Sequence, residues 1–142
     1  MAAGGCFCGN IRVEYNGKSV MAGICHCQDC RKLTGSTFSY SFVIKDADLN
    51  VTGTPKCVPK TADSGNSIRN YFCPDCGTPL FGRRFNGDEP DGDTIILRAG
   101  IFDNLELLNT QKPGAELYVD SRLDWVAPIE GAAQFNGMLE LP

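Results

Sequence analysis

Short apolar segments recur along the chain, and turn-forming residues follow them. Residues 11–15 alternate apolar and polar side chains and lead into Asn16-Gly17, and residues 80–85 lead into a second Asn-Gly pair. This alternation, closed by Asn-Gly, is typical of a half-buried strand that enters a hairpin turn. Aromatic and β-branched residues predict four further strands, over residues 39–44, 68–73, 94–99 and 116–120. The pattern therefore predicts a sheet of short antiparallel strands.

Helical periodicity is almost absent from the sequence. One short helix is predicted over residues 28–33, because Gly35 can adopt the left-handed conformation that commonly ends a helix. The acidic stretch 87–93 is predicted to be a solvated hairpin loop, since its carboxylates lack the spacing of a calcium loop. No internal repeat or linker interrupts the pattern. We therefore predict one mainly β domain over residues 1–142, with one short helix.

Composition and charge narrow the function classes. The 142 residues are 42% hydrophobic and 21% charged, as expected of a globular protein. The net charge of −4 argues against a nucleic-acid partner, because phosphate binding needs a basic face. The first five residues lack the features of a signal peptide, and no segment approaches the roughly 20 apolar residues that span a bilayer. We therefore expect a cytoplasmic protein that does not bind nucleic acid or membrane.

Seven of the eight cysteines fall into three tight clusters. Thiols stay reduced in the cytosol, so closely spaced cysteines there are more often metal ligands than disulfides. A Cys-x-x-Cys turn supplies two ligands, whereas a structural zinc site takes four. We therefore assign a closed, structural zinc site to two of the clusters together, namely Cys6, Cys8, Cys73 and Cys76.

The third cluster is Cys25, Cys27 and Cys30, which offers only three thiolates. A zinc ion with three protein ligands keeps one position open, where an incoming thiol can bind and lose its proton. Three alternatives remain at this point. His26 could close the site, although in an extended segment its side chain would point away; Cys57 could close it; or the three cysteines could form a redox group without metal.

Three ordered motifs resemble those of a known family. They are Cys-x-Cys-Gly at 6–9, Cys-His-Cys-x-x-Cys-Arg-Lys-x-Thr-Gly-Ser at 25–36 and Phe-Cys-x-x-Cys-Gly-Thr-Pro-Leu at 72–80. Together they are similar to the glutathione-dependent formaldehyde-activating enzyme family, which includes the centromere protein V-like domains. The resemblance extends to Trp125, which we expect to anchor the carboxy-terminal tail.

The resemblance implies an Mss4-like fold of short antiparallel strands built around zinc knuckles, with two zinc ions per chain. Four cysteines match the structural-zinc ligands of the family, and Cys25, Cys27 and Cys30 match the ligands of its catalytic zinc. The implied activity is the addition of glutathione to formaldehyde, classed in reverse as a carbon–sulfur lyase reaction. The expected partners are thus glutathione, or a similar thiol, and a small electrophile.

Glutathione carries two carboxylates, so its site needs cations and hydrogen-bond donors near the zinc. Arg31, Lys32 and Ser36 follow the third cluster closely and are our candidates for these contacts. Arg83 and Arg84 could contribute from a second strand, but adjacent strand residues point to opposite faces, so at most one should face the site. The competing hypothesis is a non-catalytic module for a protein partner, with both zinc ions structural. The three-cysteine cluster favours the enzyme, because a structural site has no reason to stop at three ligands.

Overall fold

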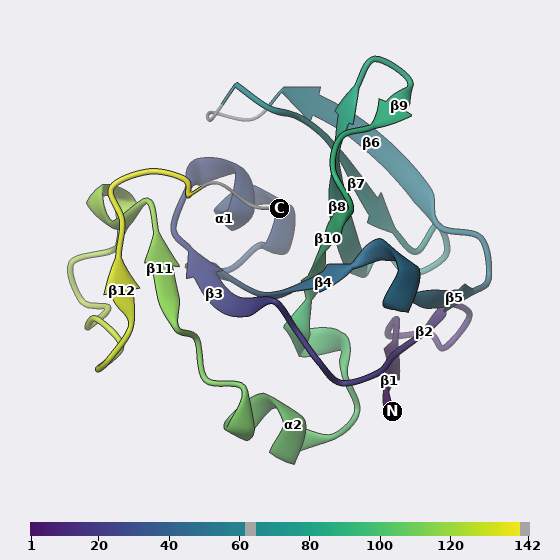
Figure 1. Cartoon of the computed structure of the whole chain (residues 1–142), viewed down its shortest axis with the longest axis horizontal. Coiled ribbons are helices and arrows are strands. Elements are labelled where there is room, and N and C mark those ends of the chain that lie inside the picture. The colour runs from purple at the N-terminus through teal and green to yellow at the C-terminus, as the bar shows by residue number, and fades with distance from the viewer. Residues whose placement is uncertain (62–64, 140–142) are drawn as a thin grey trace.

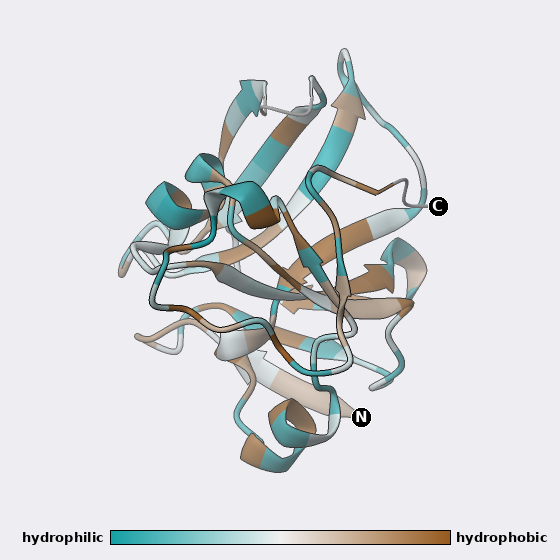
Figure 2. Ribbon diagram, turned by 90° about the vertical axis from the view of Figure 1, so that its left-hand side faces the viewer, coloured by the Kyte–Doolittle hydropathy of each residue, from teal (hydrophilic) through white to brown (hydrophobic). Residues whose placement is uncertain are grey.

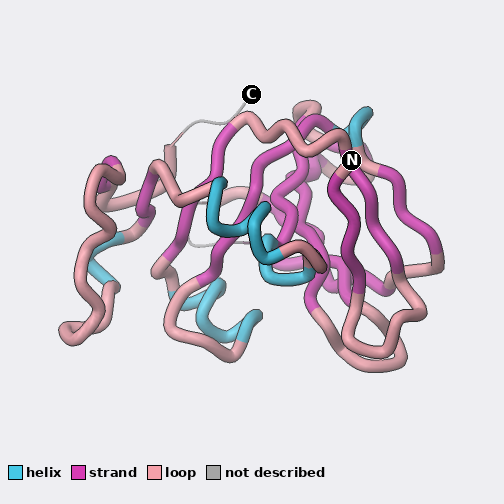
Figure 3. The backbone as a smooth tube through the Cα atoms, turned by 90° about the horizontal axis from the view of Figure 1, so that it is seen from below, coloured by secondary structure: helices cyan, strands magenta, loops and turns pink. Residues whose placement is uncertain are grey.

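Two β-sheets share one hydrophobic core (Figure 1). The computed structural model describes residues 1–61 and 65–139. The smaller sheet has the order β1-β2-β5 and lies at the end of the molecule near the N-terminus (Figure 3). Its strands are antiparallel: β1 (Ala2–Gly5), β2 (Arg12–Tyr15) and β5 (Asn50–Thr52).

The larger sheet has the order β12-β11-β3-β4-β10-β8-β7-β6, and β9 pairs with β8 off this path. Its neighbours are antiparallel, except that β11 runs parallel to both β3 and β12. The strands are β3 (Met21–Cys25), β4 (Ser39–Lys45), β6 (Lys56–Thr61), β7 (Ser67–Phe72), β8 (Pro79–Asn86), β9 (Glu89–Pro90), β10 (Thr94–Arg98), β11 (Ala115–Leu117) and β12 (Ala133–Gln134). The predicted mainly β fold is confirmed, and each predicted strand overlaps an observed one.

The predicted helix is α1 (Gln28–Thr34), and it ends at Gly35, whose φ of 67° is left-handed as expected. A second short helix, α2 (Leu105–Thr110), was not predicted, and Asn104 caps it by accepting a hydrogen bond from the Glu106 N–H. Three 3₁₀ turns complete the fold, over Asp46–Asp48, Ala99–Ile101 and Val119–Ser121. In the described part of the chain, no helix combines the length and apolarity that crossing a membrane requires.

Aromatic side chains from both sheets meet in the core. The Tyr15 ring of the smaller sheet lies 6.3 Å from the Phe42 ring of the larger one, and Phe102 packs against both, at 5.3 Å and 5.8 Å between ring centroids. Phe42 and Ile44 of β4 face this core, whereas Ser41 and Val43 point to the other face of the sheet. Hydrophobic residues accordingly gather on the interior strands (Figure 2). The opposite face of the larger sheet, which carries Ser41 and Val43, lines a pocket.

Candidate functional site

Four cysteine sulfurs converge where the two sheets meet. The sulfurs of Cys6, Cys8, Cys73 and Cys76 all lie within 4.8 Å of one another. The Cys6–Cys8 and Cys8–Cys73 sulfur distances are 3.6 Å and 3.7 Å. Thiolates bound tetrahedrally to one zinc ion lie about 3.8 Å apart, given a zinc–sulfur bond of about 2.3 Å. A disulfide would need about 2.05 Å. The spacing therefore fits a single metal ion.

Local turns hold these sulfurs in place. Cys6 accepts a hydrogen bond from the Ile11 N–H at 3.2 Å, at the entry to the second strand. Gly77, with a φ of 81°, lets the chain reverse after the Cys-x-x-Cys pair. The Thr78 hydroxyl then lies 3.2 Å from the Cys76 sulfur. Hydrogen bonds from the Thr78 hydroxyl and backbone N–H lower the pKa of the Cys76 thiol to about 6, which favours the thiolate that metals bind.

In space the cysteines thus form two groups. The first cluster is the group of four just described. The second cluster is Cys25, Cys27 and Cys30, the third group along the sequence, and its sulfurs also lie within 4.8 Å of one another. Cys25 ends β3, Cys27 is the N-cap of α1, and Cys30 lies in the first turn of that helix. The Cys30 N–H donates to the Cys27 sulfur at 3.3 Å. Within residues 1–61 and 65–139, no fourth His, Cys, Asp or Glu ligand joins this group, and Cys57 lies in neither cluster.

The three sulfurs interact strongly with one another. Hydrogen bonds from Cys25 and Cys27, together with the charge of Arg98, lower the pKa of the Cys30 thiol to about 2. Hydrogen bonds to Cys27 and Cys30 in turn raise the pKa of Cys25 well above its usual range. One of the three thiols therefore ionises readily, and its negative charge disfavours ionisation of the other two unless a cation compensates the charge. The donor set fits a soft or borderline divalent cation such as zinc.

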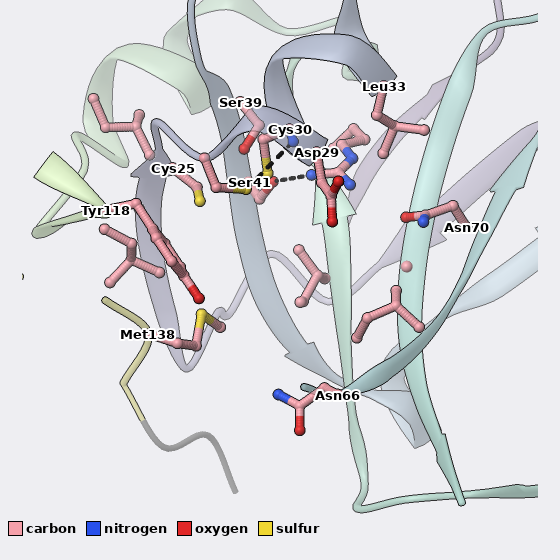
Figure 4. Close-up of a pocket in the computed structure, with 18 of the residues that line it drawn as sticks. Cys25, Asp29, Cys30, Leu33, Ser39, Ser41, Asn66, Asn70, Tyr118 and Met138 are labelled. Atoms are coloured by element: carbon pink, nitrogen blue, oxygen red, sulfur yellow. Dashed lines mark hydrogen bonds between the residues drawn. The ribbon is translucent and has the colours of Figure 1, made fainter. Parts of the chain in front are cut away.

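A cavity of about 400 Å³ opens beside the second cluster, and all three of its cysteines line it. The floor of the cavity is the face of the larger sheet that points away from the core. In Figure 4, Cys25 and Cys30 lie near Ser39 and Ser41 at one end, while Asn66 lies at the other. The first cluster does not line this cavity. The two clusters thus differ in surroundings as well as in ligand number.

The family model described as glutathione-dependent formaldehyde-activating enzyme matches residues 1–121. The chain belongs to this family. The matched residues include both cysteine clusters, all three strands of the smaller sheet and most strands of the larger sheet.

Relatives of this family member match over a shorter stretch. A Penicillium rubens protein is 37% identical over 80 residues, and proteins of Aspergillus flavus and Aspergillus oryzae are each 31% identical over 80 residues. All three carry provisional names as glutathione-dependent formaldehyde-activating enzymes. Each match covers 55% of this chain and 41% of the relative, so the matched stretch spans less than half the length of these relatives.

One solved structure shows the same fold. The crystal structure of a Rhodobacter sphaeroides protein is similar to 94% of this chain and 98% of its own chain, with a TM-score of 0.51 and 18% sequence identity. At that identity the likeness concerns the fold alone.

His26, between two cysteines of the second cluster, points away from them and is fully buried. Its Nε2 lies 2.8 Å from Oε1 of Glu116, which is also fully buried. Burial alone would raise the pKa of the Glu116 carboxyl, but hydrogen bonds from Gln134, His26 and the Ile129 N–H, with Arg122 nearby, lower it to about 2. The ionised Glu116 carboxylate can only accept hydrogen bonds, so Nε2 of His26 is the protonated ring nitrogen and donates to it.

The candidate glutathione contacts lie in different places. Lys32 lines the cavity, whereas Arg31 and Ser36 lie outside its lining. Arg84 also lines the cavity, while Arg83 instead pairs with an aspartate 2.8 Å away in the Asp46–Asp48 turn. As expected from strand geometry, only one of these two adjacent arginines faces the site.

Arg98 and Tyr118 are among the pocket residues that were not anticipated from the sequence. Arg98 ends β10, is only 9% exposed and donates from Nη1 to the Ser41 hydroxyl at 3.0 Å. A charged residue that closes the apolar run of residues 95–97 is the one signal that could have marked it. Tyr118 lines the cavity with a left-handed φ of 54°, which costs a non-glycine residue about 1–3 kcal/mol. Backbone strain of this kind cannot be read from residue type.

Proposed function

We propose that this chain is a zinc-dependent enzyme that joins glutathione to a small electrophilic carbonyl compound such as formaldehyde, or releases it in the reverse, lyase direction. The observation that carries the proposal is a cluster of three cysteines, without a fourth ligand in the described chain, that opens into a cavity. A structural site would instead have four protein ligands and leave no position open. Membership of the glutathione-dependent formaldehyde-activating enzyme family supports the same chemistry.

The two clusters have separate roles in this proposal. Cys6, Cys8, Cys73 and Cys76 hold a structural zinc ion that ties the smaller sheet to the β7–β8 turn. Cys25, Cys27 and Cys30 hold the second, catalytic zinc ion, which when bound would lower the pKa of an incoming thiol. All eight cysteines are free thiols in the structure, which suits a reducing compartment such as the cytoplasm.

The residues around the second cluster supply charge and orientation. The guanidinium of Arg98 is close enough to Cys30 to lower the pKa of that thiol. The same cation, held by Ser41, can stabilise the oxyanion that develops when a thiolate attacks a carbonyl carbon. Lys32 and Arg84 line the same cavity and are placed to meet the carboxylates of the glutathione peptide.

Proton transfer needs no further strong base. The thiol proton goes to solvent, the thiolate adds to the carbonyl carbon as the C=O π bond breaks, and the new alkoxide takes a proton from water, so the product is a thiohemiacetal and no net acid is formed. His26 takes no direct part in this scheme, because its Nε2 is occupied by Glu116 and its ring is buried. Holding both reactants together supplies most of the rate advantage for so reactive an aldehyde.

The reaction can be tested by exchange NMR spectroscopy on mixtures of glutathione and ¹³C-formaldehyde, which interconvert slowly with S-hydroxymethylglutathione. We expect the zinc-loaded protein to accelerate this exchange in proportion to its concentration, and Cys27→Ser to abolish the acceleration. Cys57→Ser is the matched control, since Cys57 lies in neither cluster. Exchange at the uncatalysed rate with the wild-type, two-zinc protein would reject the proposed function.

A further inference from the structure

The floor of the cavity is built in rows that run across the larger sheet. Residues at alternate positions of a strand face the same side, and paired residues of neighbouring strands lie side by side. Cys25 of β3 pairs with Ser39 of β4, at the cysteine end. Gly23 pairs with Ser41, which pairs with Arg98, in the next row. All five residues line the cavity.

The third row is apolar from β3 to β10, and beyond Gly82 of β8 it reaches the polar Asn70 of β7, which also lines the cavity. Met21 of β3 pairs with Val43 of β4, which pairs with Ile96 of β10, and Ile96 pairs with Gly82 of β8. All four line the same cavity as the cysteines. Four residues separate the first row from the third along β3, or roughly 14 Å at about 3.4 Å per residue. The cavity therefore passes from thiols, through a buried cation, to an apolar surface.

The side-chain pattern of β10 shows that this apolar surface is separate from the core. Ile95 and Leu97 are buried in the core, on the opposite face of the strand. Ile96, between them, is only partly buried and lines the cavity. Gly82 adds no side chain to the third row, and the side chain of its partner Asn70 on β7 lies over it, with Oδ1 3.0 Å from where a Cβ of Gly82 would be. Formaldehyde has a single carbon and no apolar group, and glutathione is a polar peptide. Neither accounts for the third row.

We propose that the electrophile carries an apolar chain, and that the third row, Met21, Val43 and Ile96, binds that chain while the carbonyl lies beside Arg98. This inference rests on the proposed function and names its substrate class: aliphatic aldehydes longer than formaldehyde, or the glutathione conjugates that they form. The volume of about 400 Å³ is within the range of small-molecule sites.

The reaction is the same addition with a larger group. The glutathione sulfur forms a bond to the aldehyde carbon, and the π bond of the carbonyl breaks. Its electron pair goes to the oxygen, which takes a proton from water, while the thiol proton goes to solvent. Atoms and charge balance, and no oxidant or reductant is needed.

Binding of S-alkyl glutathiones tests the assignment without turnover. We would titrate glutathione and its S-methyl, S-butyl and S-hexyl derivatives into the zinc-loaded protein by calorimetry. Since each buried methylene contributes about 0.8 kcal/mol, affinity should rise by up to about fourfold per added carbon until the third row is covered. Equal affinity along the series, or a decline with length, would overturn the inference.

Two variants of Ile96 should change this dependence in opposite directions. Ile96→Phe narrows the third row, so the gain in affinity of S-hexylglutathione over glutathione should be lost. Ile96→Ala widens the row, so the gain should continue to longer chains. The control pair is Val51→Phe and Val51→Ala, on the half-exposed β5 of the smaller sheet. A chain-length dependence that neither Ile96 variant alters would also overturn the inference.

The same titrations separate this inference from the proposed function. Glutathione binding without any gain from alkyl chains rejects only the apolar substrate class. If no glutathione species binds, the proposed glutathione chemistry fails. In that case titration with 1-hexanethiol tests whether the third row binds an apolar chain. Binding that Ile96→Phe weakens would support an apolar ligand at the third row, whereas no binding would reject it.

Discussion

Nε2 of His26 lies 2.8 Å from Oε1 of Glu116, and both side chains are fully buried. The two residues are 90 positions apart in the sequence. His26 separates two cysteines of the second cluster, and Glu116 belongs to β11, which pairs with β3. This hydrogen bond therefore links the cysteine turn to the carboxy-terminal part of the chain, through Gln134 and the backbone of Ile129.

The first prediction concerns this link. Glu116→Gln should destabilise the protein by about 2–4 kcal/mol, because the neutral amide cannot accept all the hydrogen bonds that converge on the buried carboxylate. Chemical denaturation at neutral pH measures the change in the free energy of unfolding. Glu130→Gln, at an exposed position, is the matched control and should change stability by less than about 0.5 kcal/mol. Equal stability of both variants would show that the network contributes little.

The second prediction is a pH dependence. The pKa of Glu116 is about 2 in the folded chain, below its ordinary value of 4.5. A lowered pKa means that the stabilisation is complete above about pH 4.5 and is lost as the pH falls towards 2; the shift corresponds to about 3 kcal/mol. The stability gap between wild type and Glu116→Gln should therefore be largest at neutral pH and shrink below pH 4.5. Acid would remove any metal that the cysteines bind from both proteins, so the gap between them is the informative quantity. A gap that stays constant from pH 7 to pH 3 would contradict this reading.

The third prediction tests Arg98 as the stabiliser of the developing oxyanion. Arg98→Met should lower kcat by about 10²–10³-fold, with a much smaller effect on KM, because the charge is needed mainly in the transition state. Exchange kinetics at several formaldehyde concentrations separate the two parameters. Arg83→Met is the control, since Arg83 pairs with Asp46 and lies outside the cavity lining. An increase in KM alone would instead place Arg98 in substrate binding.

The fourth prediction separates the two clusters. Cys76→Ser should impair folding, because the first cluster joins the smaller sheet to the β7–β8 turn and a structural zinc ion contributes folding free energy directly. Cys27→Ser should leave a folded protein that lacks thiol chemistry. Circular dichroism and thermal unfolding of both variants provide the comparison. If both unfold to the same extent, the two clusters share one structural role.

Much of the fold and the cysteine clusters could be predicted because the signals are local. Alternation and Asn-Gly turns mark β2 and β8, and the Cys-x-Cys and Cys-x-x-Cys spacings mark the ligand groups. β1, with the sequence Ala-Ala-Gly-Gly, carries no strand signal, and it forms because it pairs with β2. The predicted strand at 116–120 stops at Leu117, because Tyr118 adopts a left-handed conformation.

The rest depends on contacts between distant residues. Glu116 reads as an ordinary polar strand residue, and only its burial against His26 reveals the network. Arg98 similarly gains its meaning from Ser41, 57 positions away. The expectation for Trp125 was wrong: the side chain is 75% exposed, so it does not anchor the tail by burial in this chain. Residue type alone does not encode such placements.

Elemental analysis of zinc per chain distinguishes an open metal site at the second cluster from the closed site at the first. We expect two zinc ions in the wild type and in Cys57→Ser, and one in Cys27→Ser. Glutathione added to the wild type should bind without releasing either ion. Equal zinc content in the wild type and Cys27→Ser would contradict this assignment, because Cys27 would then not be needed for metal binding.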